Sequence, residues 1–468
     1  MKKTLVYTVV VVSAFISTSP FAKVSLASGT GAEVSHTVVA ASGVAAPAGG
    51  IYNGFSIVRL NARGQAAFGA TLRGPSTTGI FLADGNGTAT IALGGDPDPS
   101  SGNFGFVTNP SLTRSGEVLF DADGTSTLVS NGRSLVPMVR NGDPAPGGGT
   151  LTPFSSIANA RGLLAFDAAV AGATSTVGTF LTDGASVVSI ARDNTLAPGG
   201  GLFTFFDMPA INDRGQVAFV ADMTGGPSDF GIFRGDGRVL TAMFLANQDA
   251  PGGATFLDFG DPAINNRGQV AASALLSGPN PNGLFVGNGE HIIAIALEGQ
   301  PAPTGGNYRG IFADPITLND RGDVAFSIGL TGTTGGHGVF RGDGTYTTTI
   351  AVAGMPAPGT TGIFRSFGDM KLGDDGRVAF IATLTPGIGG VDTTNSKGIW
   401  VGTSDLDLRL VVRTGDVVGG RVLTNLPSGL GQLDMNSSAL AWIGTFPSRA
   451  TAVVLSSIST DHDEAQRH

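Results

Sequence analysis

The sequence predicts an all-β protein, a single eight-bladed β-propeller with four antiparallel strands in each blade. Three observations lead to this fold class. A short string of the form Asn-x-x-Gly-x-x-Ala-Phe recurs along most of the chain, glycine is abundant (73 of 468 residues) while charged residues are few (13%), and the two chain ends are complementary parts of one repeat. A β-solenoid is the alternative, because repeats can also stack in a line between capping ends.

The period of the repeat is set by its glycines. These are Gly64, Gly116, Gly162, Gly215, Gly268, Gly322 and Gly376. The intervals between them are 52, 46, 53, 53, 54 and 54 residues. A period slightly above 50 residues is typical of propeller blades and is too long for leucine-rich or hexapeptide repeats.

One period is enough to place four strands. The apolar run 202–211 predicts the first strand, and Asn212 to Gly215 predicts a type I turn with a glycine bulge, because Asn bonds its own backbone and Gly accepts a positive φ. The following strands are predicted at 216–222, 231–234 and 239–245. A Pro-Gly segment such as APGG then leads to the next period, since proline stops strand pairing.

The chain ends predict how the ring closes. Residues 36–56 look like 348–367, so the chain begins with a fourth strand and its exit loop. Residues 429–446 and 450–458 supply strands one to three and then stop. We therefore expect the strand around Val38 to complete the C-terminal blade, which removes sheet edges that would otherwise stay open.

The N-terminus predicts an export signal over residues 1–27. Met1-Lys2-Lys3 is a basic start, 4–17 is apolar but too short to cross a bilayer easily, and small residues favour cleavage after Ala27. A short buried strand is the alternative. We expect the propeller at 35–458 and a polar tail at 459–468, with no membrane span in the mature chain, which would be periplasmic or extracellular.

Composition excludes several classes of function. The chain has no cysteine, so disulfides, thiolate metal sites and cysteine nucleophiles are excluded. A net charge of −9 and a pI near 5.0 argue against a nucleic-acid partner, which would favour a basic face.

The motif at 212–219 and 319–326 resembles the bacterial choice-of-anchor tandem-repeat proteins, which are defined by this NxxGxxAF pattern. The resemblance covers nearly the whole mature chain. It implies an exported surface protein, and it supplies no catalytic residues, because the family's biochemical role is essentially unassigned. Members usually carry a C-terminal sorting signal, whereas this chain ends in STDHDEAQRH, so we expect no anchoring by that route.

The repeated motif residues are expected to serve the fold. Asn makes the turn, Gly permits it, and Ala-Phe packs between sheets. The motif arginines are expected to reach a neighbouring carboxylate or carbonyl group. They are Arg63, Arg161, Arg214, Arg267 and Arg321.

Candidate binding residues are expected on the rim formed by the second-to-third loops and the exit loops. They are Tyr52, Tyr308, Arg309 and His337. We expect a non-catalytic binding or scaffold module for a glycan or an envelope protein, because motifs for catalysis are missing. The alternative is a lyase-like, polysaccharide-active enzyme in which His337, Tyr308 and Arg309 abstract a proton beside a sugar carboxylate.

Acidic residues recur near the first strands. They are Asp207, Asp258, Asp261, Asp314 and Asp369. Ordinary solvated or capping carboxylates are the leading interpretation, and a Ca²⁺ ring that loses thermal stability in chelator is the alternative. Asn109 and Ser155 stand near the equivalent places in two blades, which makes such a ring uneven. No other cofactor is expected.

Overall fold

The computed structural model describes residues 24–26, 34–99, 102–124, 126–310, 316–427 and 429–458. The expected export signal, apart from 24–26, and the expected tail at 459–468 lie outside the described residues.

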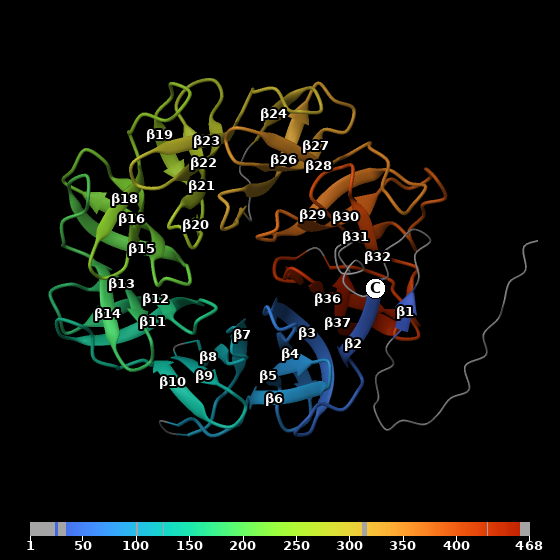
Figure 1. Cartoon of the computed structure of the whole chain (residues 1–468). Helices are drawn as coiled ribbons and strands as arrows, with labels where there is room; N and C mark the ends of the chain where they lie inside the picture. The colour runs from blue at the N-terminus through green and yellow to red at the C-terminus, as the bar shows by residue number, and fades with distance from the viewer. Residues whose placement is uncertain are drawn as a thin grey trace, which may run out of the picture.

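Eight antiparallel sheets are arranged around one axis, as Figure 1 shows. Each sheet is a meander of neighbouring strands, with the first strand innermost. The predicted eight-bladed β-propeller is therefore confirmed. The solenoid alternative is wrong, because the N-terminal strand β2 (Val34–Ala41) pairs with the C-terminal strand β37 (Ala450–Ile458) and closes the ring.

The strands of the first four blades follow the predicted meander. Blade 1 contains β3 (Ile51–Leu60), β4 (Ala66–Arg73), β5 (Thr78–Asp84) and β6 (Gly87–Leu93). Blade 2 contains β7 (Val107–Leu112), β8 (Val118–Ala122), β9 (Ser126–Ser130) and β10 (Leu135–Val139). Blade 3 contains β11 (Thr150–Ala158), β12 (Leu164–Ala171), β13 (Val177–Thr182) and β14 (Val187–Arg192). Blade 4 contains β15 (Leu202–Ile211), β16 (Val217–Thr224), β17 (Phe230–Gly235) and β18 (Leu240–Leu245).

The remaining blades keep the order, but two first strands are broken into pairs of short segments. Blade 5 contains β19 (Phe256–Phe259), β20 (Ala263–Ile264), β21 (Val270–Leu276), β22 (Asn282–Gly287) and β23 (Ile292–Leu297). Blade 6 contains β24 (Asn307–Arg309), β25 (Thr317–Leu318), β26 (Val324–Thr331), β27 (His337–Gly342) and β28 (Thr347–Val352). Blade 7 contains β29 (Phe364–Leu372), β30 (Val378–Leu384), β31 (Lys397–Gly402) and β32 (Arg409–Arg413). Blade 8 contains β2 and β37 with β35 (Leu433–Met435) and β36 (Ala439–Phe446), and β1 (Val24–Leu26) pairs with the outer edge of β2.

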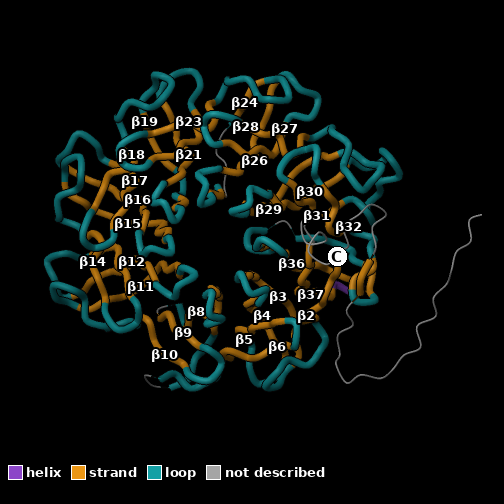
Figure 2. Tube along the Cα trace, in the orientation of Figure 1, coloured by secondary structure: helices purple, strands orange, loops and turns teal. Residues whose placement is uncertain are grey.

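A few elements were not expected from the repeat. A small hairpin, β33 (Val417–Val418) and β34 (Arg421–Val422), precedes blade 8, and the 3₁₀ turn Pro447–Arg449 joins β36 to β37. Figure 2 shows that strands and loops otherwise make up the ring. In the described part of the chain, no helix has the length and apolarity needed to cross a membrane.

In most blades, the motif phenylalanine packs against an aromatic residue on the next strand of the same blade. In blade 4, Phe219 is fully buried and its ring stacks on that of Phe233 on the next strand, with centroids 5.9 Å apart. The same stacking joins the corresponding residues of blades 1, 3 and 6, and Phe380 with Trp400 in blade 7. Burying a large aromatic ring stabilises a fold by about 1.5–3 kcal/mol, so the repeat places a strong apolar contact in most blades.

Asparagines at the turns between first and second strands join six of the eight blades to the next. Each amide nitrogen donates a hydrogen bond to the backbone carbonyl oxygen of the corresponding residue in the following blade, over 2.8–3.2 Å. The donors are Asn61, Asn159, Asn212, Asn265, Asn319 and Asn436. The last of these donates to Asn61, so this series of bonds, which we call the asparagine ring, runs across the closing blade.

Asn212 shows why the residue is suited to this position. Its side-chain oxygen accepts hydrogen bonds from the backbone N–H groups of Arg214 and Gln216, which is the expected turn-making role. Its amide nitrogen donates to Gln216 Oε1 and to the carbonyl oxygen of Asn265, both at 2.8 Å. The side chain is 4% exposed, so all of its hydrogen-bonding capacity is satisfied without water.

The motif glycine and arginine also match their expected roles. The seven motif glycines have φ between +76° and +96°, as the predicted turn requires. Arg63 donates to the carbonyl oxygen of Ser115, Arg267 to that of Arg321, and Arg321 to that of Asp375, each in the following blade. The expectation that the arginines reach a neighbouring carbonyl is confirmed for these three.

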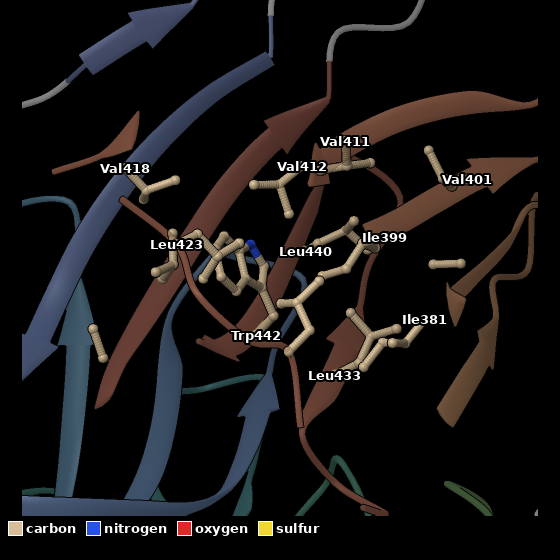
Figure 3. Packing of buried hydrophobic residues seen from close by; sticks show 14 of the residues in the cluster. Ile381, Ile399, Val401, Val411, Val412, Val418, Leu423, Leu433, Leu440 and Trp442 are labelled. Carbon is tan, nitrogen blue, oxygen red and sulfur yellow. The ribbon is translucent and has the colours of Figure 1, made fainter. Parts of the chain in front are cut away.

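An apolar core and one short series of side-chain hydrogen bonds, which we call the polar relay, hold the closing blade together. Figure 3 shows Trp442 and Leu440 of β36 packed with Ile399 of blade 7 and Leu423. The indole N–H of Trp442 donates to Ser456 Oγ, which is also hydrogen-bonded to His36 Nδ1 at 2.8 Å. This relay joins the N-terminal strand to two C-terminal strands, and its histidine is only 3% exposed.

We expect Asn212→Asp to weaken the ring. The introduced carboxylate keeps the turn-making oxygen but loses both donated bonds and sets a second acceptor against the carbonyl of Asn265, at a cost of about 2–3 kcal/mol. The measurement is the shift in the denaturant midpoint at constant slope.

Asn288→Asp is the matched control for this substitution. The side chain of Asn288 uses only its oxygen, which accepts from the backbone of Glu290 and His291, and the equivalent turns of other blades already carry Asp183 and Asp236. We expect a change within about 0.5 kcal/mol. Equal midpoints for the two variants would show that the asparagine ring contributes little to stability.

We expect the free energy of unfolding to fall in acid because His36 is buried in the closing blade. Burial lowers the pKa of this histidine to about 4, so the unfolded chain binds the proton more tightly. The contribution to stability is complete above about pH 6.5 and is lost as pH falls towards 4, by up to about 3 kcal/mol. We expect His36→Gln to remove this part of the acid sensitivity in unfolding curves recorded at about pH 7.5 and about pH 4.5. Identical losses in wild type and variant would contradict the assignment.

Candidate functional site

The two tyrosines of the expected rim lie inside the blades. The residues Tyr52 and Tyr308 are 2% and 4% exposed, and they belong to separate interblade cores. Burial raises the pKa of both phenols, that of Tyr308 to about 12. The structure therefore does not bring them together, and neither is ready to act as a base at neutral pH.

The other two rim residues share one sheet of blade 6. Arg309 and His337 both pair with Gly329 of β26, one from each side, so their side chains project from the same face of the sheet. Arg309 is exposed, whereas His337 is half-buried, lies 3.2 Å from Ser327 Oγ and packs on Phe367 of blade 7. Burial lowers the pKa of His337, which favours the neutral ring.

The acidic residues of the calcium alternative occupy different environments. Asp314 lies outside the described residues. Asp207 and Asp258 each accept a hydrogen bond from the backbone N–H of the following residue, and Asp261 is exposed. Asp369 is 2% exposed, and burial raises its pKa. Among the described ranges, no three Asp, Glu or His side chains gather closely enough to hold a metal ion.

A hollow of about 210 Å³, with both polar and apolar lining, lies between the inner strands of blades 1, 2 and 3. It is lined in part by Ile57 and Arg59 of β3, Asn109 to Ser111 of β7, Asp121 of β8, Thr127 of β9, and Ser156 to Ala158 of β11. A smaller hollow at the same junction contains Asp121, Gly124 and Phe154. Because Asp121, Thr127 and Ser156 line both hollows, we treat the two as one candidate site, named the Asp121 site.

Asp121 is held by neutral donors at the centre of this site. Its Oδ1 accepts hydrogen bonds from the hydroxyl groups of Thr127 and Ser156, over 2.9 and 3.1 Å. Its Oδ2 accepts from the side-chain amide of Asn109, over 3.1 Å. Three neutral partners fix the carboxylate without neutralising it, and such a group can still bind a hydroxyl or a cation.

The site lies where the repeat departs from its own pattern. In blade 2, Thr113 replaces the ring asparagine, and the contact with blade 3 is a backbone hydrogen bond from Arg114 to Ala160 at 2.8 Å. The neighbouring Asn109 has a φ of +51°, at a bulge where the pairing of β7 with β8 shifts. Corresponding bulges occur in the first strands of blades 1, 4 and 7, and Met208 of blade 4 also has a positive φ, so what distinguishes this junction is the loss of the ring asparagine beside a fixed carboxylate.

Asp121 is not among the site residues expected from the sequence, although the repeat contains a signal for it. The residue after the motif phenylalanine is an aspartate only in blades 2 and 3, as Asp121 and Asp167, and it is Gly, Val, Ser or Ile in the other blades. The signal is therefore a difference between repeats at one position, and not an acidic residue that recurs in every repeat.

Asp167 is the buried counterpart of Asp121. It is 0% exposed, its Oδ1 accepts from Thr179 Oγ1 at 2.6 Å, and its Oδ2 has no hydrogen-bond partner in the described structure. Burial raises its pKa to about 7 against the opposing bond from Thr179, and the charge of Asp207 adds to the rise. Equivalent carboxyl groups in adjacent blades thus occupy contrasting environments.

Comparisons with known proteins identify one family. A family described as a family of unknown function (DUF7453) matches residues 12–134, 123–282 and 277–439. No curated protein matches the sequence.

Solved structures resemble the ring only distantly. A puromycin-hydrolysing peptidase of Mycobacterium tuberculosis is 13% identical with a TM-score of 0.43, over 84% of this chain and 58% of that chain. An α-L-arabinanase of Penicillium chrysogenum is 15% identical with a TM-score of 0.29, over 58% of this chain and 87% of that one. The chain thus spans little more than half of the peptidase, and these likenesses concern the fold alone.

Asp167→Asn should change how stability depends on pH. The folded pKa lies above the ordinary value, so the stability contributed by the protonated group is complete below about pH 4 and is lost as pH rises to about 7. We expect the variant to exceed wild type by about 2–4 kcal/mol at pH 8 and to match it near pH 4. A constant difference across this range in denaturant unfolding would contradict the buried, protonated group.

Proposed function

Because the chain belongs to this family of unknown function, with three successive matches along the ring, we propose that it is an exported, non-catalytic binding module. Its ligand, a glycan or a segment of an envelope protein, is held at the Asp121 site. The observation that carries the proposal is a hollow with fixed polar groups at the junction where Thr113 replaces the ring asparagine. Pockets that combine apolar walls with a few fixed polar groups are typical ligand sites.

The side chains of the Asp121 site support binding rather than turnover. Its polar groups are a carboxylate, an amide, hydroxyl groups and the guanidinium of Arg59, and they supply both donors and acceptors. Phe154 adds an exposed apolar face beside the carboxylate, at 49% exposure. No histidine lines either hollow.

The lyase-like alternative has less support from the geometry. Its tyrosine, Tyr308, is buried, and the Asp121 site lies at blades 1 to 3 rather than at blade 6. A base for proton abstraction must reach the substrate within hydrogen-bond distance. His337 and Arg309 alone do not provide such a set.

We expect the protein to retain members of an array of bacterial polysaccharides and purified envelope proteins without releasing unsaturated uronates. Asp121→Asn combined with Phe154→Ala should reduce retention by about tenfold, since a fixed polar contact and an apolar contact are both removed. Tyr346→Ala is the control, because Tyr346 is 78% exposed at a turn on the opposite face.

Two results would contradict the proposal. Retention that is unchanged in the double variant would place binding elsewhere. Release of unsaturated uronate that disappears in His337→Ala would favour the lyase instead.

A further inference from the structure

The charges near the axis are unevenly distributed around the ring. The first strands of blades 2 to 5 carry no lysine or arginine, and those of blades 4 and 5 carry Asp207 and Asp258. The basic residues of first strands lie on blades 1, 6 and 7: they are Arg59, Arg309, Arg365 and Lys371. Together with Asp121 on the second strand of blade 2, the aspartates give blades 2 to 5 a negative inner surface.

Three phenylalanines are exposed on this acidic half. Phe106, Phe154 and Phe205 are 43%, 49% and 47% exposed, on consecutive blades 2, 3 and 4. They belong to or directly precede the innermost strand, whereas the motif phenylalanines are buried. Since soluble proteins rarely leave neighbouring large apolar side chains in water, a row of this kind marks a binding surface.

A carboxylate accompanies the aromatic residues at each end of the row. Phe154 and Asp121 line the same small hollow, and Gly124 of that hollow lies beside the ring of Phe106. Phe205 pairs across strands with Asp222, so the two side chains are neighbours on one face. Burial raises the pKa of Asp222, and the charges of Asp229 and Asp258 add to the effect.

These carboxylates have no cationic partner in the described structure. The described residues form two ion pairs, Arg114 with Asp213 and Arg377 with Asp375, and both belong to turns between first and second strands. Strand direction alternates in a meander, so those turns lie on the face opposite the second-to-third loops. No ion pair of the described residues involves the acidic surface on the other face, which we name the acidic–aromatic arc, and Arg59 is the one cation that lines the larger hollow with Asp121. The arc consists of Phe106, Phe154, Phe205, Asp121, Asp222 and Asp258.

We propose that the acidic–aromatic arc binds a basic polypeptide segment in which lysine or arginine alternates with apolar residues. This inference rests on the proposed function, because it names the ligand class of the same site. A cation placed over a phenylalanine face and beside a carboxylate gains from both contacts, and apolar neighbours cover the remaining aromatic surface. A neutral glycan would leave the negative charge unmatched, and an anionic polysaccharide would be repelled.

The test uses two synthetic probes and calorimetry on the full chain. One probe is a peptide of alternating lysine and leucine, and the other is a set of neutral oligosaccharides. We expect wild type to bind the peptide and to bind it several-fold more weakly at about 0.3 M salt. Asp121→Asn with Asp222→Asn should weaken binding by about tenfold or more, as should Phe154→Ala with Phe205→Ala.

Matched controls separate the arc from the general acidity of the chain. Asp183→Asn with Asp343→Asn removes the same charge from turns on the opposite face, where blades 2 and 5 already carry Asn131 and Asn288. Binding in this variant should stay within about twofold of wild type. Tyr346→Ala is the corresponding aromatic control.

The outcomes distinguish this inference from the proposed function. Peptide binding that falls equally in the arc and control variants would overturn the inference as non-specific attraction. Binding of a neutral oligosaccharide that depends on Asp121, without peptide binding, would overturn the inference and leave the proposed function standing. Failure of both probes would overturn the inference, and failure of the envelope array as well would remove the proposed function.

Discussion

The ring depends on one constraint: a buried amide must find a partner for each of its donors and acceptors. Asn212 meets it only because the turn of blade 5 presents a carbonyl oxygen 2.8 Å away. The same requirement passes from blade to blade until Asn436 donates to Asn61. Each blade thus fixes the position of the next, and a break at a buried position would leave a polar group unpaired at a cost of about 1–3 kcal/mol.

Two turns, those of blades 7 and 2, lack the asparagine and therefore escape this constraint. Blade 7 replaces the asparagine with Gly373, and the side chain of Arg377 bridges to the next blade instead. Blade 2 replaces it with Thr113 and relies on the backbone, so a hollow and a fixed carboxylate are tolerated beside it. A closed ring held by many repeated contacts can carry two such junctions without losing its shape, and the one with a hollow and a fixed carboxylate is suited to a ligand site.

Burial separates the candidate side chains into those that stabilise the fold and those that can contact a ligand. The phenols of Tyr52 and Tyr308 and the carboxyl group of Asp167 lie in interblade cores, where burial favours their neutral forms. Asp121 and Phe154 lie at the surface of the inner strands. The contrast between Asp121 and Asp167 shows that equivalent positions in a repeat need not have equivalent chemistry.

The sequence by itself determined the blade count, the strand order and the turns, because they follow from patterns within one repeat, and the closure, because the two chain ends supply complementary parts of one blade. Alternating apolar residues and a glycine at the fourth turn position act within one repeat, and Val38 pairs with Val454 as the complementary ends require. The broken first strands, the bridging role of the asparagine amide, the burial of the tyrosines and the Asp121 site were decided only by the tertiary structure. They depend on which side chains of adjacent blades meet and how much water reaches them, and a one-dimensional pattern does not contain that distance information.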